Sequence, residues 1–230
     1  MPLNEVHQIL ITKRDIMYTF MDKYLFSRAN VQRNNILNTP ENFINVIRFC
    51  INTRQRTVNA QRENAINYFN FHYTAIRDAV NQGNWELLKN LIYLRHRNEE
   101  YMISNGLNYP IGVGQKIGSF ILEVLIHYGE ANPDLESELY VPIDTHVHHI
   151  LSECLGVNIT NNLDITTPSF INFQNMLSEN THNNNPRIYF DYLWFIGKMF
   201  CTQRQNGNGF RLCNICWIRE NCIYANKWFI

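Results

Sequence analysis

The stretch that decides the fold is Y-P-I-G-V-G-Q-K at 109–116, which interrupts a helical pattern with two glycines two positions apart. Glycine lacks a Cβ, so the chain can turn tightly here with its backbone N–H groups pointing outward. The sequence predicts a short turn between two helices, and the N-terminus of the second helix would favour a phosphate group. Taken alone, such a pattern is more often a plain helix–helix turn. The helical spacing resumes directly after it, at Ile117, Phe120, Ile121, Val124 and Leu125.

Working outward from this turn, the rest of the chain also follows a helical period. Apolar residues recur at i, i+3 and i+4, and no segment alternates as a strand would. Thr39-Pro40 and Thr167-Pro168 each combine an N-cap residue with a proline at the first helical position. The sequence therefore predicts an all-α protein. Further helices are expected at about 5–28, 58–80, 84–103, 116–129, 145–156 and 186–200.

Composition and charge set limits on the class of protein. The 230 residues are 45% hydrophobic and carry zero formal net charge, which is not typical of a generic polyanion binder. Basic residues nevertheless gather locally, as at Arg48, Arg54, Arg56 and Arg62, although such a run is usually just a solvated face. No apolar stretch reaches the roughly 18 residues that a membrane span needs, and no secretory signal is visible. We expect an intracellular monomer, in the cytoplasm and nucleoid or in the nucleus, with no membrane partner.

Four cysteines near the C-terminus have the spacing of a metal site. Cys201, Cys213, Cys216 and Cys222 follow the pattern C-x11-C-x2-C-x5-C. Four thiolates suit a [4Fe–4S] cluster, and a structural zinc ion is the alternative that spacing alone leaves open. Disulfides are disfavoured because nothing indicates secretion. The remaining cysteines, Cys50 and Cys154, stand in apolar runs where a buried thiol is the default, and neither is expected to be a ligand.

Three motifs occur in an order that resembles one enzyme family. They are I-G-V-G-Q-K at 111–116, I-D-T-H-V-H-H-I at 143–150, and I-G-K-M-F-C at 196–201 with C-N-I-C-W-I-R-E-N-C at 213–222. Together they resemble the helix-hairpin-helix DNA glycosylases, in particular the endonuclease III branch with its C-terminal Fe–S cluster loop. The resemblance implies two domains: a helical barrel at 29–140 containing the hairpin, and a second helical domain made of 1–28 with 141–230. It also implies a double-stranded DNA partner.

The same resemblance implies the catalytic pair. Its nucleophilic lysine falls on Lys116 and its essential aspartate on Asp144. The chemistry is consistent, since a carboxylate stabilises the oxocarbenium character that develops when an N-glycosidic bond breaks, and a neutral amine can capture C1′. A lysine with the ordinary pKa of about 10.4 must be shifted to do so. Without the motif, Lys116 would be read as a phosphate-binding lysine and Asp144 as the N-cap of a helix starting near Thr145.

Other residues are assigned to DNA or to the base. Gln55, between Arg54 and Arg56, resembles the family's glutamine that fills the gap left by a flipped base, although a polar helix end is an equal alternative. Phosphate contacts are expected from six residues and a base pocket from five more, and core packing is the alternative for the three pocket residues at 191–195. The phosphate contacts are Arg54, Arg56, Arg211 and Arg219 with the glycine turn of Gly112 and Gly114; the pocket residues are His146, His148, Asp191, Trp194 and Phe195.

The chain also departs from the family in two places. The family places its first two cluster cysteines closer together, and an acidic insertion, G-E-A-N-P-D-L-E-S-E-L at 129–139, separates Lys116 from Asp144. The expected activity is that of a bifunctional DNA glycosylase and abasic-site lyase acting on an oxidised pyrimidine. The alternatives are 8-oxoguanine, a modified cytosine of phage DNA, or a DNA-binding module without catalysis.

Replacing Gln55 tests the wedge assignment. Gln55→Ala should slow base excision from duplex DNA and leave excision from single-stranded DNA unchanged, because only a duplex has a gap to fill. Single-turnover rates on the two substrates measure this. Equal slowing on both would reject the wedge role.

Overall fold

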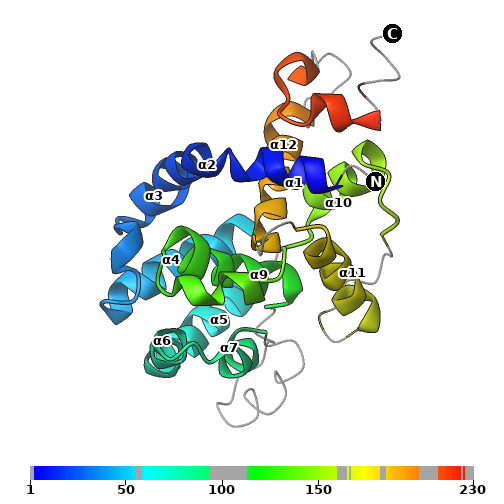
Figure 1. The fold of residues 1–230 in the computed structure, drawn as a ribbon. Helices are drawn as coiled ribbons and strands as arrows, with labels where there is room; N and C mark the ends of the chain where they lie inside the picture. Colours follow the sequence, from blue (N-terminus) through cyan, green and yellow to red (C-terminus); the bar gives the residue numbers. More distant parts are fainter. Residues whose placement is uncertain are drawn as a thin grey trace. The chain divides into compact units, whose positions relative to one another are not determined.

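The computed structural model describes residues 3–54, 59–93, 113–159, 165, 167–181, 185–201, 212–223 and 225, without the side chains of residues 53 and 54. Within these residues the protein is all-α, with eleven α-helices, several short 3-10 and π-helical segments and no strand (Figure 1). The predicted fold class is therefore confirmed at this level. No helix in the described part is long and apolar enough to cross a membrane.

The chain divides into two compact units. One consists of Met1–Met17 together with Tyr140–Ile230, and the other of Tyr18–Leu139. The division implied by the family resemblance assigned residues 18–28 to the discontinuous domain, whereas here they belong to the continuous unit. The boundary falls inside helix α2 (Arg14–Met21).

The continuous unit, Tyr18–Leu139, is built around α4 (Pro40–Arg54), which packs against α5 (Asn59–Phe71) and α9 (Gln115–Glu123) (Figure 1). Phe43 of α4 supplies the centre of this core, with its ring 5.5 Å from that of Tyr73 and 6.5 Å from that of Phe69. The remaining segments of the unit are η1 (Asp22–Phe26), α3 (Ser27–Ala29), η2 (Arg33–Asn35), α6 (Tyr73–Asn81), α7 (Trp85–Ile92), η4 (Val124–Tyr128) and η5 (Pro133–Glu138).

The discontinuous unit contains two helices that each run without a break into a π-helical segment. α10 (Thr145–His149) continues as η6 (Ile150–Cys154), and α12 (Tyr192–Ile196) continues as η8 (Gly197–Cys201). Both continuous helices therefore end in a cysteine. The other segments are α1 (Leu3–Ile11), α11 (Pro168–Glu179), η7 (Arg187–Asp191), η10 (Leu212–Ile215) and η11 (Arg219–Asn221).

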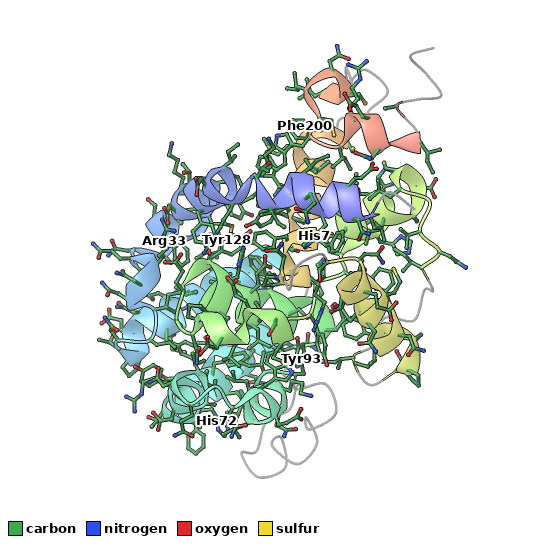
Figure 2. All side chains as sticks on the ribbon, viewed as in Figure 1. His7, Arg33, His72, Tyr93, Tyr128 and Phe200 are labelled. Atoms are coloured by element: carbon green, nitrogen blue, oxygen red, sulfur yellow. The ribbon has the colours of Figure 1, made fainter. Side chains whose placement is uncertain are left out.

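Two buried polar contacts hold this unit together. His7 of α1, labelled in Figure 2, forms a hydrogen bond through Nε2 with the carbonyl oxygen of Pro186 (3.1 Å), and its ring lies 4.9 Å from that of Phe190. The amide of Gln174 in α11 accepts from the N–H of Val141 (2.9 Å) and donates to its carbonyl (3.0 Å). The second contact fixes the extended segment that leads to Asp144.

The expected helix starts are confirmed, and three expected helices are shorter than predicted. The helix expected at 84–103 ends at Ile92, because the backbone of Tyr93 leaves the helical region (φ −90°, ψ 86°). Thr39 Oγ1 accepts from the N–H of Asn42 (3.2 Å), and Thr167 caps α11 in the same way. The helix expected at 5–28 is broken after Ile11, where the hydroxyl of Thr12 donates to the carbonyl of Ile9 (2.7 Å). Such local bonding competes with the helical ladder. The helix expected at 58–80 is interrupted at His72, whose backbone leaves the helical region (φ −92°, ψ 8°).

A close contact positions the helix that carries Lys116. The ring of Tyr93, labelled in Figure 2, packs directly on Gly118 of α9, and its hydroxyl bonds the hydroxyl of Ser119 (2.9 Å). A Cβ at Gly118 would lie 2.6 Å from Tyr93 Cδ1, a distance that real side chains do not tolerate. α9 is thus held against Tyr93 within one turn of Lys116.

Gly118→Ala should destabilise the protein by about 1–3 kcal/mol, because the added methyl group displaces a buried ring and its hydrogen bond. Chemical denaturation measures the free energy of unfolding. Gly114→Ala is the matched control, since a Cβ there meets nothing within 4 Å. Equal losses in the two variants would show that the Tyr93 contact does not position α9.

Candidate functional site

Lys116 lies in the first turn of α9, directly after a turn with open space beside it. Gly114 is the N-cap residue of this nine-residue helix, with φ −95° and ψ −169°, and no side chain caps the helix there. Nothing lies within 4 Å of the position that a Cβ on Gly114 would take, so a phosphate or sugar could approach the backbone closely. The Lys116 side chain is half-buried. Gly112 lies outside the described residues.

Asp144 is the N-cap residue of α10, which confirms the structural alternative foreseen for it. Its Oδ1 accepts hydrogen bonds from the N–H groups of His146 (2.8 Å) and Val147 (2.9 Å), and the residue is 7% exposed. Both bonds end on one carboxylate oxygen. The carboxylate is therefore held in a fixed orientation at the start of the helix. Lys116 belongs to the continuous unit and Asp144 to the discontinuous one, and their sharing of one active site stays a prediction.

The helix that Asp144 caps is in tight contact with the helix that ends at Cys201. A Cβ at Gly197 would lie 2.7 Å from His146 Cβ and 3.3 Å from both the Cα and the carbonyl oxygen of His146. At position 197, therefore, no side chain larger than the hydrogen of glycine fits between the two helices. His146 is held by this contact, and both His146 and His148 are partly exposed.

The remaining residues of the expected base pocket are mostly buried. Asp191 is 2% and Trp194 6% exposed, and Lys198 lies over the Trp194 ring at 5.0 Å. Phe195 is partly exposed and stacks on Trp217, with ring centroids 5.1 Å apart and an interplanar angle of 19°. Burial of this kind accords with the core-packing alternative for Asp191 and Trp194, and their contact with a flipped base stays a prediction.

The four cysteines of the spacing pattern come into one neighbourhood, and a fifth joins them. Cys216 interacts electrostatically with Cys201, Cys222 and Cys213. Cys154, expected to be an isolated core thiol, is buried but forms side-chain hydrogen bonds with Cys201 and Cys222. The sequence pattern missed this residue because it stands a long way before the others in the chain. The only feature of the sequence that pointed to this proximity was the position of Cys154 near the end of the expected helix 145–156.

The surroundings of these thiols affect their protonation. Burial raises the pKa of the Cys216 thiol to about 12, and the charges of Cys201, Cys222 and Cys213 add to the rise, while the N–H of Ile218 donates to its sulfur and opposes it. The hydrogen bonds to Cys201 and Cys222, with burial, hold the pKa of the Cys154 thiol well above its usual range. A cation bound among these sulfurs would displace their protons.

The backbone and the aromatic residues around the thiols form a shaped site. The N–H of Ala225 donates to the sulfur of Cys222 (3.4 Å), and the N–H of Cys216 donates to the carbonyl of Cys213 (3.2 Å). Trp217, next in sequence to Cys216, packs against the rings of Phe195 and Phe200, the latter labelled in Figure 2. N–H···S bonds of this kind stabilise metal-bound thiolates.

The donor set fits a thiolate-bound metal by its chemistry, although its atoms are not arranged around an ion. Among the described residues, no three His, Cys, Asp or Glu side chains converge on a point as ligands would. The thiols instead contact one another through hydrogen bonds. The number and type of the sulfurs suit iron–sulfur or zinc binding, and the binding of such a group stays a prediction.

Most of the expected DNA contacts fall where the structure gives no side chain. Gln55, Arg56 and Arg211 lie outside the described residues, as does the side chain of Arg54. Arg219 is exposed at the start of η11, between Cys216 and Cys222. Its role as a phosphate contact stays a prediction.

The acidic insertion is packed against the continuous unit. Glu136 Oε1 lies 2.7 Å from Nδ1 of the buried His127, and Asn132 donates to the carbonyl of Val80 (2.7 Å). Leu135 is buried. These contacts anchor the segment to η4 and α6, the helices that precede it.

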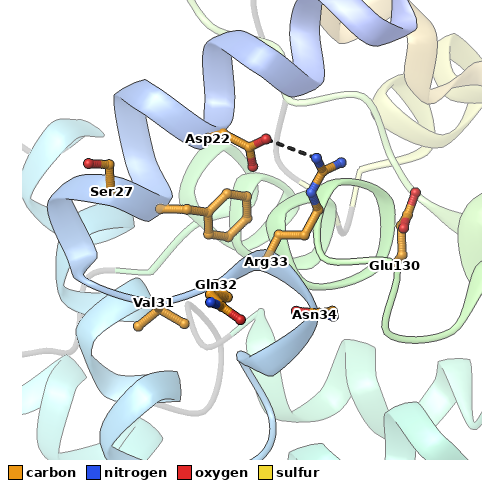
Figure 3. Close-up of a pocket in the computed structure, with 8 residues that line it drawn as sticks. Asp22, Ser27, Val31, Gln32, Arg33, Asn34 and Glu130 are labelled. Carbon is orange, nitrogen blue, oxygen red and sulfur yellow. Dashed lines mark hydrogen bonds and ion pairs between the residues drawn. The ribbon is translucent and has the colours of Figure 1, made fainter.

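A surface pocket of about 460 Å³ lies elsewhere on the continuous unit, and none of the candidate site residues lines it (Figure 3). Arg33 projects into it and is held by Asp22 at 2.8 Å. Phe26 and Glu130 also line it. With Arg33 already paired and a second carboxylate nearby, the pocket has no net attraction for phosphate, and we assign it no role in catalysis.

No family model, curated protein or solved structure matches the chain significantly. The likeness to DNA glycosylases therefore depends on the three sequence motifs alone.

Asp144 offers a way to separate its capping role from a catalytic one. Asparagine caps helices about as well as aspartate, whereas alanine costs about 0.5–2 kcal/mol. Asp144→Asn should therefore leave the free energy of unfolding nearly unchanged, and Asp144→Ala should lower it by about 1 kcal/mol. Denaturation of the two variants against the wild type measures this. Equal destabilisation by both substitutions would contradict the capping geometry.

Proposed function

We propose that the protein is a DNA N-glycosylase with abasic-site lyase activity, with the two-domain helix-hairpin-helix fold, Lys116 as nucleophile and Asp144 as the stabilising carboxylate. The observation that carries the proposal is the position of these two residues at the starts of their helices. Lys116 lies in the first turn of α9 beside the open Gly114, and Asp144 is fixed at the start of α10, and these positions support the proposal.

The reaction follows from what these two groups can do. The bond between C1′ and the base nitrogen breaks, and the base leaves with the bonding electrons and gains a proton. The carboxylate of Asp144 stabilises the positive charge that develops on the sugar. The neutral amine of Lys116 bonds to C1′ and loses a proton, and opening of the sugar ring gives a Schiff base. Loss of a proton from C2′ then expels the 3′ phosphate by β-elimination.

The nucleophile must be the neutral amine of Lys116, which lies in the first turn at the N-terminus of α9. The same N-terminus would attract the DNA phosphate next to the target nucleotide.

The proposal includes a [4Fe–4S] centre held by Cys201, Cys213, Cys216 and Cys222, with zinc as the alternative. When bound, such a group supplies folding energy to the C-terminal segment, because its ligands are brought together only in the folded chain. No catalytic step is assigned to it. The backbone N–H of Ala225 donates to the sulfur of Cys222, one of the proposed ligands.

The proposed substrate is an oxidised pyrimidine in duplex DNA, flipped out of the stack before cleavage. 8-Oxoguanine and a modified phage cytosine are the alternatives within the same class. A DNA-binding module without catalysis is the alternative of another class. Turnover on a panel of oligonucleotides, each with one of these bases, separates all four.

Lys116→Gln gives the decisive test. Wild-type protein incubated with substrate and borohydride should form a covalent protein–DNA adduct, because borohydride reduces the Schiff base, and the variant should form none while still binding DNA. Denaturing gels measure the adduct. Lys23→Gln, which changes an exposed lysine of the same unit, is the control and should trap like the wild type. A protein that excises bases but never forms an adduct would reduce Lys116 to a phosphate contact.

A further inference from the structure

A row of aromatic and basic side chains lies on the surface of the continuous unit, and the proposed catalytic pair does not use it. Its members are Phe20, Tyr24 and Arg28, from α2, η1 and α3, and Arg48 and Phe49, from α4. We call these five residues the aromatic stripe. Its rings are partly exposed and both of its arginines are exposed. The stripe therefore presents flat apolar groups and positive charge to solvent together.

Side-chain contacts hold the stripe in a fixed order. The rings of Phe20 and Tyr24 are stacked, with centroids 5.1 Å apart and an interplanar angle of 15°. The guanidinium of Arg28, four positions further along the chain, lies over the Tyr24 ring at 5.4 Å. The ring of Phe49 meets that of Tyr24 edge-on, with centroids 5.5 Å apart at an angle of 90°. Because each group is held by its neighbours, little side-chain freedom is lost when a ligand binds.

Backbone packing brings the two parts of the stripe together. Both η1 and α3 pack against α4. On α4, the residues Asn45, Arg48, Phe49 and Asn52 share the side that faces solvent, at spacings of three and four, while the opposite side is buried. The solvent side of α4 thus places a cation and an aromatic ring between two amides, which can hydrogen-bond to bases.

The charge of the stripe is not neutralised within the part of the chain that the structure describes. Neither Arg28 nor Arg48 forms an ion pair with a described carboxylate. Asp22 is already bound to Arg33 at 2.8 Å. Glu41 stands on the solvent side of α4, eight positions before Phe49. Two exposed guanidinium groups beside the rings therefore favour an anionic partner.

This combination of groups favours single-stranded nucleic acid over other anions. Bases stack on aromatic rings and on guanidinium planes, and phosphates pair with arginine. In a duplex the faces of the bases are already covered by their neighbours, so only a single strand can use both kinds of group. We propose that the aromatic stripe binds single-stranded DNA, with bases stacked on its rings and phosphates paired with Arg28 and Arg48.

The choice of DNA over RNA rests on the proposed function. The helix α4, which carries Arg48 and Phe49, ends at Arg54, an expected phosphate contact. A strand that leaves the duplex at that end of α4 can continue along the solvent side of the same helix. The stacking site itself depends on neither Lys116 nor Asp144.

Binding of a fluorescein-labelled oligothymidylate to the full-length protein, followed by fluorescence anisotropy, tests this inference. Thymine is not one of the proposed substrate bases. The wild type should bind with a dissociation constant of roughly 10⁻⁶ to 10⁻⁴ M, as in sequence-independent binding. Tyr24→Leu removes the central ring and should weaken binding at least about fivefold. Phe71→Leu is the matched control and should bind like the wild type, since it removes a 78% exposed ring of the same unit outside the stripe.

Arg28→Gln tests the contribution of charge. It should weaken binding and reduce the slope of log K against log salt by about 0.7, the value for one phosphate contact on a single strand. Arg77→Gln is its control. Arg77 also lies over a tyrosine ring, that of Tyr73 at 5.7 Å, but it is paired with Asp78 at 2.8 Å. This control removes the same charge from the unit and should leave the slope unchanged.

Chemical denaturation shows whether each variant is folded, and Arg28→Gln, which changes an exposed side chain, carries the test should Tyr24→Leu not fold. No binding of oligothymidylate, or equal affinities in each variant and its control, would overturn the inference. Tighter binding of oligouridylate would overturn DNA as the partner. A dimer that is lost in Tyr24→Leu would also overturn the inference, because the stripe would then join two copies of the chain.

The two proposals fail separately. Wild-type protein that binds oligothymidylate through the stripe but never forms the borohydride adduct would contradict the proposed function alone. Adduct formation without binding of oligothymidylate would contradict the role of the aromatic stripe alone.

Discussion

The discontinuous unit depends on one close contact, that between Gly197 and His146. It lets the helix that starts at Asp144 and ends at Cys154 lie directly against the helix that ends at Cys201. A methyl group at this point would separate the two helices and move both of their ends. Asp144, the proposed catalytic carboxylate, and Cys154 lie at opposite ends of the same helix. The missing side chain at Gly197 lets the neighbouring helix pack closely enough to fix this helix in position.

The candidate functional groups lie near helix ends, where the partial charges of the helix dipole affect them. Lys116 and Asp144 stand at helix N-termini, where a carboxylate is stabilised and a protonated amine is not. Cys154 is the last residue of η6, at a helix C-terminus, where a thiolate is destabilised. A sulfur in such a position is stabilised by a bound cation, by keeping its proton or by a backbone N–H donor. The N–H of Ala225 donates to the sulfur of Cys222, and the thiol of Cys154 is hydrogen-bonded to Cys201 and Cys222.

Sequence reasoning succeeded where the deciding interactions are local. The all-α class, the starts of α4 and α11, and the Asp144 cap follow from apolar periodicity and from side chains that bond the backbone two or three residues ahead. Breaks at Thr12 and His72 were missed because apolar spacing continues through them while the backbone does not. The contact of Cys154 with Cys201 and Cys222 could not be read from spacing, since it depends on the packing of two helices far apart in the chain. The apolar periodicity of a helix shows which of its faces is buried, but it does not show which other helix packs against that face.

The double role of Asp144 carries a physical consequence for the proposed chemistry. A carboxylate that caps a helix has its orientation set by two backbone N–H groups, both bonded to Oδ1. A carboxylate in this fixed orientation could stabilise the positive charge that develops on a sugar. The cap thus prepares the group for its proposed role before substrate binds, and no reorganisation is needed as the glycosidic bond breaks. The structural interpretation of Asp144, first weighed as an alternative to the catalytic one, is on this argument the means by which catalysis would be achieved.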